Sequence, residues 1–165
     1  MSVQVPASIS EETVEEISTA RDEPDWLLER RLAALDALDE VELPDVIHTP
    51  GRRWTDLESL DFESLVDPQN QSDETIRGDV EGASVLSFEA ALDDHEDLIK
   101  EHFGSVVDPE QNYITALSAA LFTTGTVIYV PQGVDVEDIT IRAEMNSRSL
   151  FSHTLVVTEQ SSSAT

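Results

Sequence analysis

Four histidines are the obvious candidate ligands in this sequence besides its carboxylates, because the chain contains no cysteine. His95 and His102 are seven residues apart. On one helix this spacing is a rise of about 10.5 Å, too far for both rings to bind one metal ion at about 2 Å. His153 precedes an apolar run, and His48 lies in an aperiodic segment that assigns it no role. The pattern therefore favours structural or surface roles over metal binding.

A cluster of carboxylates, Asp93-Asp94 with Glu96-Asp97, has the oxygen ligands that a hard cation prefers. The segment lacks the ligand spacing and the central glycine of a calcium-binding loop, which favours a solvated helix face instead. Carboxylates lie close together throughout this acidic chain, so their proximity identifies no acid–base pair. Glycine-rich phosphate loops, Gly-x-Ser-x-Gly turns and His-Glu-x-x-His helices are absent. The sequence thus predicts no catalytic, cofactor-binding or metal-binding residue.

The charge balance is extreme, with 35 acidic residues against 9 basic ones and a formal net charge of −26. The acidic residues are dispersed and 39% of all residues are hydrophobic, which argues against a disordered acidic tail. At about 1 M salt the Debye length is only ~3 Å, so the mutual repulsion of the carboxylates is screened. The pattern indicates a folded protein of halophilic origin.

The same composition excludes several classes of partner and compartment. The largest basic patches are Arg30-Arg31 and Arg52-Arg53, too few cations to bind a nucleic-acid backbone. Absence of cysteine gives no sign of an oxidising compartment. No run approaches the ~18 apolar residues of a membrane span, and the N-terminus is acidic rather than a basic signal. We therefore expect a cytoplasmic protein that binds neither nucleic acid nor membrane.

Four segments can be distinguished along the chain by their periodicity and turn residues. We predict a helical segment at 1–43, a connector rich in Pro, Gly, Asp and Ser at 44–84, an α/β segment at 85–125, and an open β region at 126–165.

The helical pattern gives specific boundaries. Ser8 with Glu11 is a candidate capping box for the first helix. In the second helix Pro24 suits the first turn, and Leu43-Pro44 should end it. Its apolar stripe is formed by leucines at positions i, i+4 and i+7, widened by other apolar residues: Leu28, Leu32 and Leu35, with Leu27, Ala34 and Leu38.

Two further helices are predicted between residues 85 and 125, after a short strand at Val85-Leu86. The first should run from Phe88 to Phe103 and end at Gly104, a residue suited to a C-terminal cap. The second should begin at Asp108-Pro109, where aspartate can cap and proline can occupy the first turn.

Three short runs rich in β-branched residues follow, and their starts are about a dozen residues apart: Thr126–Val130, Ile139–Ala143 and Thr154–Thr158. Pro131-Gln132-Gly133 has the composition of a type I turn with proline at its second position. This rhythm is typical of successive coils of a β-solenoid. The chain stops at Ala164-Thr165, where a further strand could begin. Since stacked coils need a neighbour or cap over the last apolar face, we expect this to be the front part of a larger protein.

Several blocks, read in order, resemble the SufB/SufD family of iron–sulfur cluster assembly scaffolds. The matching blocks are Glu23–Leu35, Asp94–Gly104, Asn112–Gly125 with Tyr129–Val134, and Phe151–Val157 with Ser162–Thr165. Arg53-Trp-Thr-Asp-Leu57 is similar to an element of the SufD members. The order and spacing of the blocks across nearly the whole chain make the resemblance specific.

The resemblance implies an α+β fold, in which an N-terminal helical segment leads into the first coils of a parallel β-helix, here incomplete. It also implies SufB-like and SufC-like partners, the latter an ATPase, and a transient iron–sulfur cluster on the complete assembly. The family's ATPase-binding region and its functional Cys and His positions lie near the C-terminal end, so none can be carried over to this chain. A chain ending at Thr165 should neither dock the ATPase nor nucleate a cluster. This portion is then structural and not an enzyme.

Two alternatives remain. An acidic halophilic β-solenoid or jelly-roll enzyme acting on carbohydrate would place two converging carboxylates in a cleft. A generic acidic adaptor would have no connection with clusters. Co-purification with a P-loop ATPase separates the scaffold from both alternatives.

Trp26 and Trp54 are candidate interface anchors, although Trp26 could equally pack its own helix against the body of the protein.

Overall fold

The computed structural model describes residues 9–42, 48–49, 52–53, 80–141 and 150–165. The chain forms two compact units, each assembled from two stretches of sequence. The helical unit comprises Met1–Asn70 and Val107–Leu121, and the sheet unit comprises Gln71–Val106 and Phe122–Thr165. None of the helices among these described residues has the length and apolar run that a membrane crossing requires.

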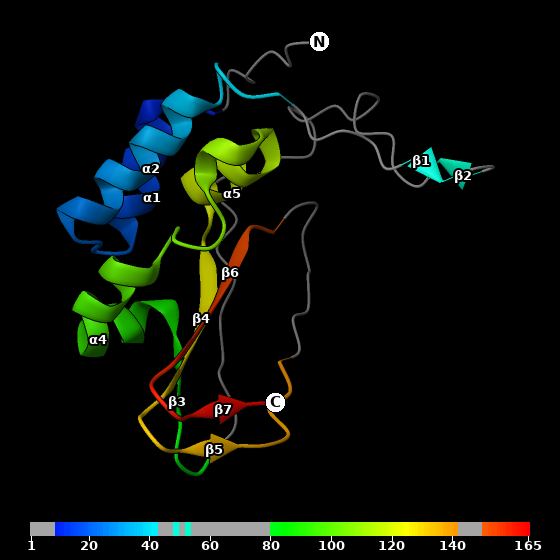
Figure 1. Ribbon diagram of the computed structural model, residues 1–165. Helices are drawn as coiled ribbons and strands as arrows, with labels where there is room; N and C mark the ends of the chain where they lie inside the picture. The colour runs from blue at the N-terminus through cyan, green and yellow to red at the C-terminus, as the bar shows by residue number, and fades with distance from the viewer. Residues whose placement is uncertain (1–8, 43–47, 50–51, 54–79, 142–149) are drawn as a thin grey trace. The chain divides into compact units, whose positions relative to one another are not determined.

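The helical unit is built around helix α2, which packs against α1 and α5. Its helices, shown in Figure 1, are α1 (Glu11–Ala20), α2 (Asp25–Ala37), the 3-10 turn η1 (Pro109–Gln111) and α5 (Tyr113–Leu121). Two short strands, β1 (His48–Thr49) and β2 (Arg52–Arg53), pair antiparallel within the predicted connector.

Helix α1 begins after Ser10, whose hydroxyl accepts a hydrogen bond from the Thr13 N–H at 3.3 Å. The predicted cap Ser8 lies outside the described residues. Val14 and Ile17 are buried, which confirms the thin apolar stripe expected for this helix.

Helix α2 differs from its prediction in both its end and its buried face. It ends at Ala37, six residues before the predicted stop at Leu43, which lies outside the described residues. Its N-cap is Pro24, without a side-chain hydrogen bond. The fully buried positions recur at i, i+4, i+7 and i+11: Leu27, Arg31, Ala34 and Leu38. The leucines predicted as the main stripe, Leu28, Leu32 and Leu35, are only half-buried, because Arg31 holds the centre of the packed face.

Helix α5 starts later than predicted because two caps act in succession. Asp108 Oδ1 accepts from the Glu110 N–H at 2.9 Å and starts η1, as expected. Asn112 Oδ1 then accepts from the Ile114 and Thr115 N–H groups at 3.0 and 3.2 Å and starts α5. A residue with a short polar side chain at the N-cap satisfies backbone donors that have no partner within the helix.

The sheet unit contains three strands in the order β3-β4-β6 and a separate pair β5-β7 (Figure 1). The elements are β3 (Ser84–Ser87), α4 (Phe88–His102), β4 (Thr124–Val130), β5 (Asp135–Val136), β6 (Ser152–Thr158) and β7 (Ser163–Ala164). Helix α4 packs against β3 and β4. The predicted short strand, the helix that follows it and the helix-ending Gly104, with φ 81°, are all confirmed.

Two of the three predicted strands are confirmed, as β4 and β6, but the described part of the third run, residues 139–141, forms no strand. The strand that follows β4 along the described chain is instead β5 at Asp135–Val136. Asp138 has φ 63°, a left-handed conformation that interrupts extended backbone after β5.

The turn after β4 lies one residue later than predicted. The Val134 N–H donates to the Pro131 carbonyl at 3.3 Å, so Pro131 is the first residue of the turn rather than the second. Gly133, with φ 74°, then stands at the third position, where turns that need a positive φ place glycine.

Candidate functional site

The distinctive feature of the sheet unit is that its two parallel strand pairs share one offset. Thr124 pairs with Ser152 and Asp135 pairs with Ser163, an offset of 28 residues in both cases. We call β4 with β5 the first rung and β6 with β7 the second rung. The two strands of the second rung therefore pair, in parallel and with the same offset, with the two strands of the first.

The side chains inside the rungs form columns whose exposure rises abruptly from one rung to the next. Ile128 on β4 is 2% exposed and packs with Val130 and Val136 in an apolar cluster. Val156 occupies the same register position on β6 and is 49% exposed. Because the two residues are aligned neighbours in one sheet, the difference shows that the described residues leave the outer side of the second rung uncovered.

The backbone of β6 is open on the same side. The Glu159 N–H donates to the Val130 carbonyl at 3.0 Å, toward β4. Backbone groups alternate in direction along a strand, so those of Thr154, Val156 and Thr158 point away from β4. Within the described part of the chain, β6 pairs with β4 alone. We call this row of backbone groups, with Val156, the open edge, and it is the candidate functional site.

Glu159, the residue that follows β6, also links the two rungs where each strand ends. The Tyr129 hydroxyl donates to Glu159 Oε1 at 2.6 Å, and the Gln132 N–H donates to Oε2 at 3.2 Å. The hydrogen bond to Glu159 raises the pKa of Tyr129, with smaller contributions from desolvation and from the carboxylate charge. The phenol therefore keeps its proton throughout the neutral range.

The histidines of the sheet unit have structural surroundings. The His95 ring lies 5.4 Å from the Tyr129 ring and marks a kink in α4, where its φ is −140° and its ψ is 39°. His153 on β6 lies edge-on to Phe103 and Phe122, with ring centroids 5.0 and 4.8 Å apart. These contacts agree with the structural roles predicted for both residues. His48 lies in β1, and His102 ends α4.

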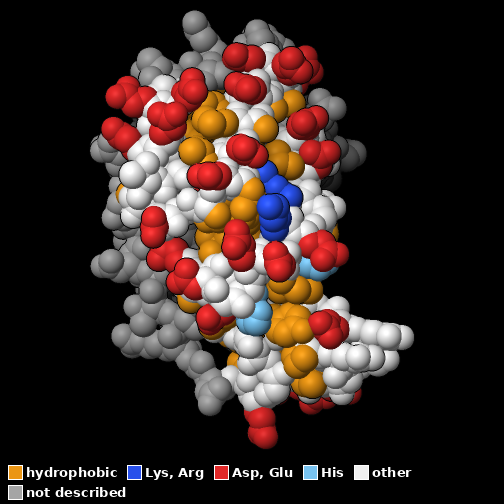
Figure 2. Space-filling model, turned by 90° about the vertical axis from the view of Figure 1, so that its left-hand side faces the viewer, with side chains coloured by type: hydrophobic (Ala, Val, Ile, Leu, Met, Phe, Trp, Pro, Cys, Tyr) orange, Lys and Arg blue, Asp and Glu red, His pale blue; other side chains and the backbone are white. Residues whose placement is uncertain are grey.

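The acidic residues 93, 94, 96 and 97 are exposed on α4, as the solvated-face interpretation predicted. In the described ranges, no group of three or more His, Asp or Glu side chains converges as metal ligands would. Carboxylates are spread over the face shown in Figure 2, whereas the coloured Lys and Arg side chains occupy one small area.

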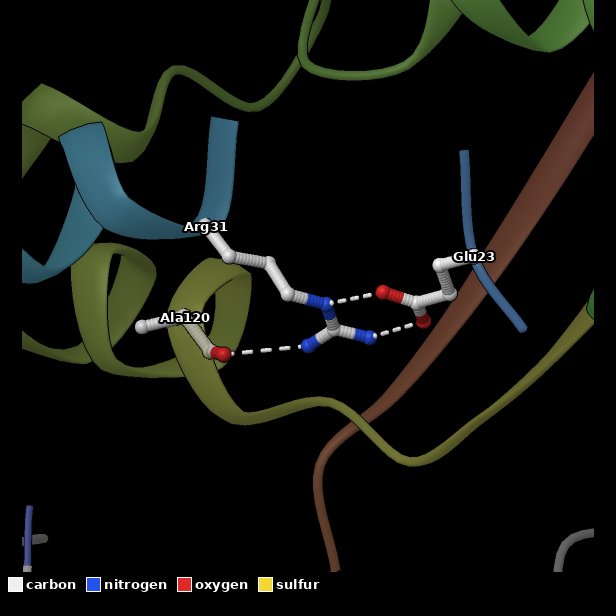
Figure 3. Close-up of polar contacts among 3 residues, drawn as sticks. All are labelled: Glu23, Arg31 and Ala120. Carbon is white, nitrogen blue, oxygen red and sulfur yellow. Dashed lines mark hydrogen bonds and ion pairs between the residues drawn. The ribbon is translucent and has the colours of Figure 1, made fainter. Parts of the chain in front are cut away.

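A buried ion pair in the helical unit is the second notable arrangement. Arg31 is 0% exposed, and its Nε and Nη2 donate to the two carboxylate oxygens of Glu23 at 2.8 and 2.6 Å (Figure 3). Its Nη1 donates to the carbonyl of Ala120, in the last turn of α5, at 3.0 Å. We call these three residues the Arg31 clamp. It joins the turn before α2 to the carboxyl end of α5, where a cation complements the helix dipole.

The electrostatics of the clamp are dominated by burial. Desolvation lowers the pKa of Arg31, while the hydrogen bond and the charge of Glu23 oppose that effect. A guanidinium nevertheless remains charged at neutral pH, so the pair is a charge-assisted, bidentate contact. The sequence analysis did not predict this ion pair. The available signal was the position of Arg31 within the stripe of Leu27, Ala34 and Leu38.

Comparisons with known proteins place these features in a family. A family model described as the SufBD protein N-terminal region matches residues 63–141. An iron–sulfur cluster assembly SufBD family protein of Mycobacterium tuberculosis is 28% identical over an alignment of 205 positions, covering 93% of this chain and 23% of the relative. SufB of Bacillus subtilis is 26% identical over 94% of this chain and 42% of its own length.

SufD of Bacillus subtilis is 28% identical over the whole of this chain and 46% of its own length. The chain thus spans less than half the length of these relatives. The matches extend over the predicted blocks in both the helical and the sheet units. These matches, with the family model over residues 63–141, support the assignment of this chain to the SufB/SufD family.

Proposed function

We propose that this chain is the opening portion of a SufD-like scaffold in iron–sulfur cluster assembly, acting in the cytoplasm with SufB-like and SufC-like proteins. It is not itself an enzyme. Its β region forms the first coils of a parallel β-helix, and the open edge receives the next coil. The transient cluster belongs to the complete assembly, as cargo, and needs no ligand from these residues.

The shared offset of 28 residues in two separate strand pairs is the observation that carries the scaffold role. A β-sandwich or jelly roll would be built from antiparallel neighbours, whereas both pairs here are parallel. The exposed Val156 continues a buried column and requires a cover. Stacking a further rung would bury this side chain and satisfy the open backbone groups together.

The choice of SufD over SufB rests on Arg53-Trp-Thr-Asp-Leu57, of which all but Arg53 lies outside the described residues. SufB and SufD relatives match this chain at 26% and 28% identity, so identity alone does not separate them. The comparisons give no support to the carbohydrate-active alternative.

Co-expression with a SufB-like protein and a SufC-like ATPase tests the proposal. The whole gene product, carrying an affinity tag, should retain both partners through purification. Val156→Asp should reduce their recovery at least about tenfold, because a charge placed in the stacked column opposes burial. Val106→Asp is the matched control: Val106 is 91% exposed and lies outside both rungs, so recovery should be unchanged.

Two results would count against the scaffold role. Purification of the unmodified gene product without either partner would contradict the assignment. Equal recovery with Val156→Asp and Val106→Asp would instead show that the open edge does not organise the coils that the partners need.

A further inference from the structure

We infer that residues 80–87 form a terminal cap that closes the β4 side of the rungs, so that strands can be added only at the open edge. This inference rests on the coil stacking proposed above. It assigns opposite roles to the two sides of the stack: one is sealed against other chains, and the other accepts a strand.

The cap is distinguished first by its strand direction and length. Strand β3 pairs antiparallel with β4, with Ser84 opposite Tyr129 and Ser87 opposite Thr126, whereas the rungs pair in parallel. It has only four residues, and Ser87 at once becomes the N-cap of α4 by accepting from the Ala90 N–H at 3.1 Å. Very short edge strands are poor templates for pairing with another chain.

The same segment also covers the interior of the first rung. Its apolar side chains pack against the buried cluster of Ile128, Val130 and Val136, and they are Val80, Ala83 and Val85. These contacts help to bury Ile128, at 2% exposure, while Val156 at the other end of the column is 49% exposed. The segment thus seals both the backbone edge and the apolar interior of the first rung.

A glycine fixes the turn that brings the cap into place. Gly82 has φ 90°, and a Cβ atom there would lie 2.8 Å from Val134 Cγ1. Alanine at this position would combine an unfavourable conformation with a steric clash. Gly133 has φ 74°, and a Cβ atom on it would meet nothing within 4 Å. It therefore provides a control with the same backbone strain and no clash.

Amide hydrogen exchange on Gly82→Ala and Gly133→Ala in the whole gene product tests the cap. The Val130 carbonyl faces β6, so the N–H groups of Val127 and Tyr129 face β3. In Gly82→Ala, exchange at these two amides should accelerate at least about tenfold through local opening. The weight-average mass in sedimentation should also rise with concentration as exposed β4 edges pair. Gly133→Ala should match the parent in both measurements.

Unchanged exchange at Val127 and Tyr129 in Gly82→Ala would overturn the cap, as would faster exchange without any increase in mass. The same behaviour in Gly133→Ala would overturn it too, because strain alone would then explain the result. If Gly82→Ala does not fold, Val80→Ser weakens the same contacts more gently and is judged by the same two measurements. Failure of the stacking proposal would be seen separately, as fast amide exchange at Thr154, Val156 and Thr158 of β6 in the parent protein.

Discussion

Replacing Arg31 with methionine should lower the free energy of unfolding by about 3–5 kcal/mol, the range typical of breaking a buried ion pair from one side. The substitution leaves the Glu23 carboxylate without the guanidinium that compensates its burial, and it removes the donor to the Ala120 carbonyl. Urea denaturation followed by circular dichroism, at a salt concentration that keeps the parent folded, measures the change.

Arg30→Met is the matched control on the same helix. Arg30 is half-buried and lies 5.2 Å from the centre of the Trp26 ring, and a cation–π contact at such a site is worth about 0.5–1 kcal/mol. The double variant Glu23→Leu with Arg31→Met should recover most of the lost stability, because the unpaired charge is gone. Equal losses for Arg30→Met and Arg31→Met, or a double variant no better than Arg31→Met alone, would contradict the role of the clamp.

Removing salt should destabilise the protein by several kcal/mol. With a net charge of −26 on 165 residues, self-repulsion opposes the compact state once the Debye length grows from about 3 Å at 1 M to about 10 Å at 0.1 M. For a chain of this size each kcal/mol shifts Tm by about 2–4 °C. Thermal unfolding in KCl between about 0.1 and 2 M should therefore show a rise of about 10 °C or more.

Sucrose provides the control for this salt effect. It stabilises compact states by exclusion from the protein surface and does not screen charge. At low salt, sucrose should restore only part of the stability that KCl restores. A Tm that is independent of KCl concentration, or equal rescue by sucrose, would show that repulsion among the dispersed carboxylates is not what limits this fold.

Much of the local structure could be predicted from the sequence because short-range physics decides it. The alternation of β-branched residues located β4 and β6, and Gly104 marked the end of α4. The strand expected from residue 139 was wrong over its described residues, 139–141, because apolar periodicity cannot reveal that Asp138 adopts a left-handed conformation just before them.

Long-range relationships were harder to predict. The apolar periodicity of α2 predicted that Leu28, Leu32 and Leu35 form the centre of its buried face, since a charged residue such as Arg31 normally lies outside a core. Arg31 is buried because its partners Glu23 and Ala120 are brought together by the packing of α2 on α5. The offset of 28 residues and the clash that requires glycine at position 82 likewise depend on pairing between distant segments.

The most direct test of the coil-stacking claim is amide exchange along β6 in the whole gene product. The N–H groups of Thr154, Val156 and Thr158 point to the open edge, away from β4. If a further rung pairs there, these amides should exchange as slowly as the neighbouring ones that bond β4. Fast exchange at all three, beside slow exchange at Leu155 and Val157, would show that β6 remains an edge and would contradict the account.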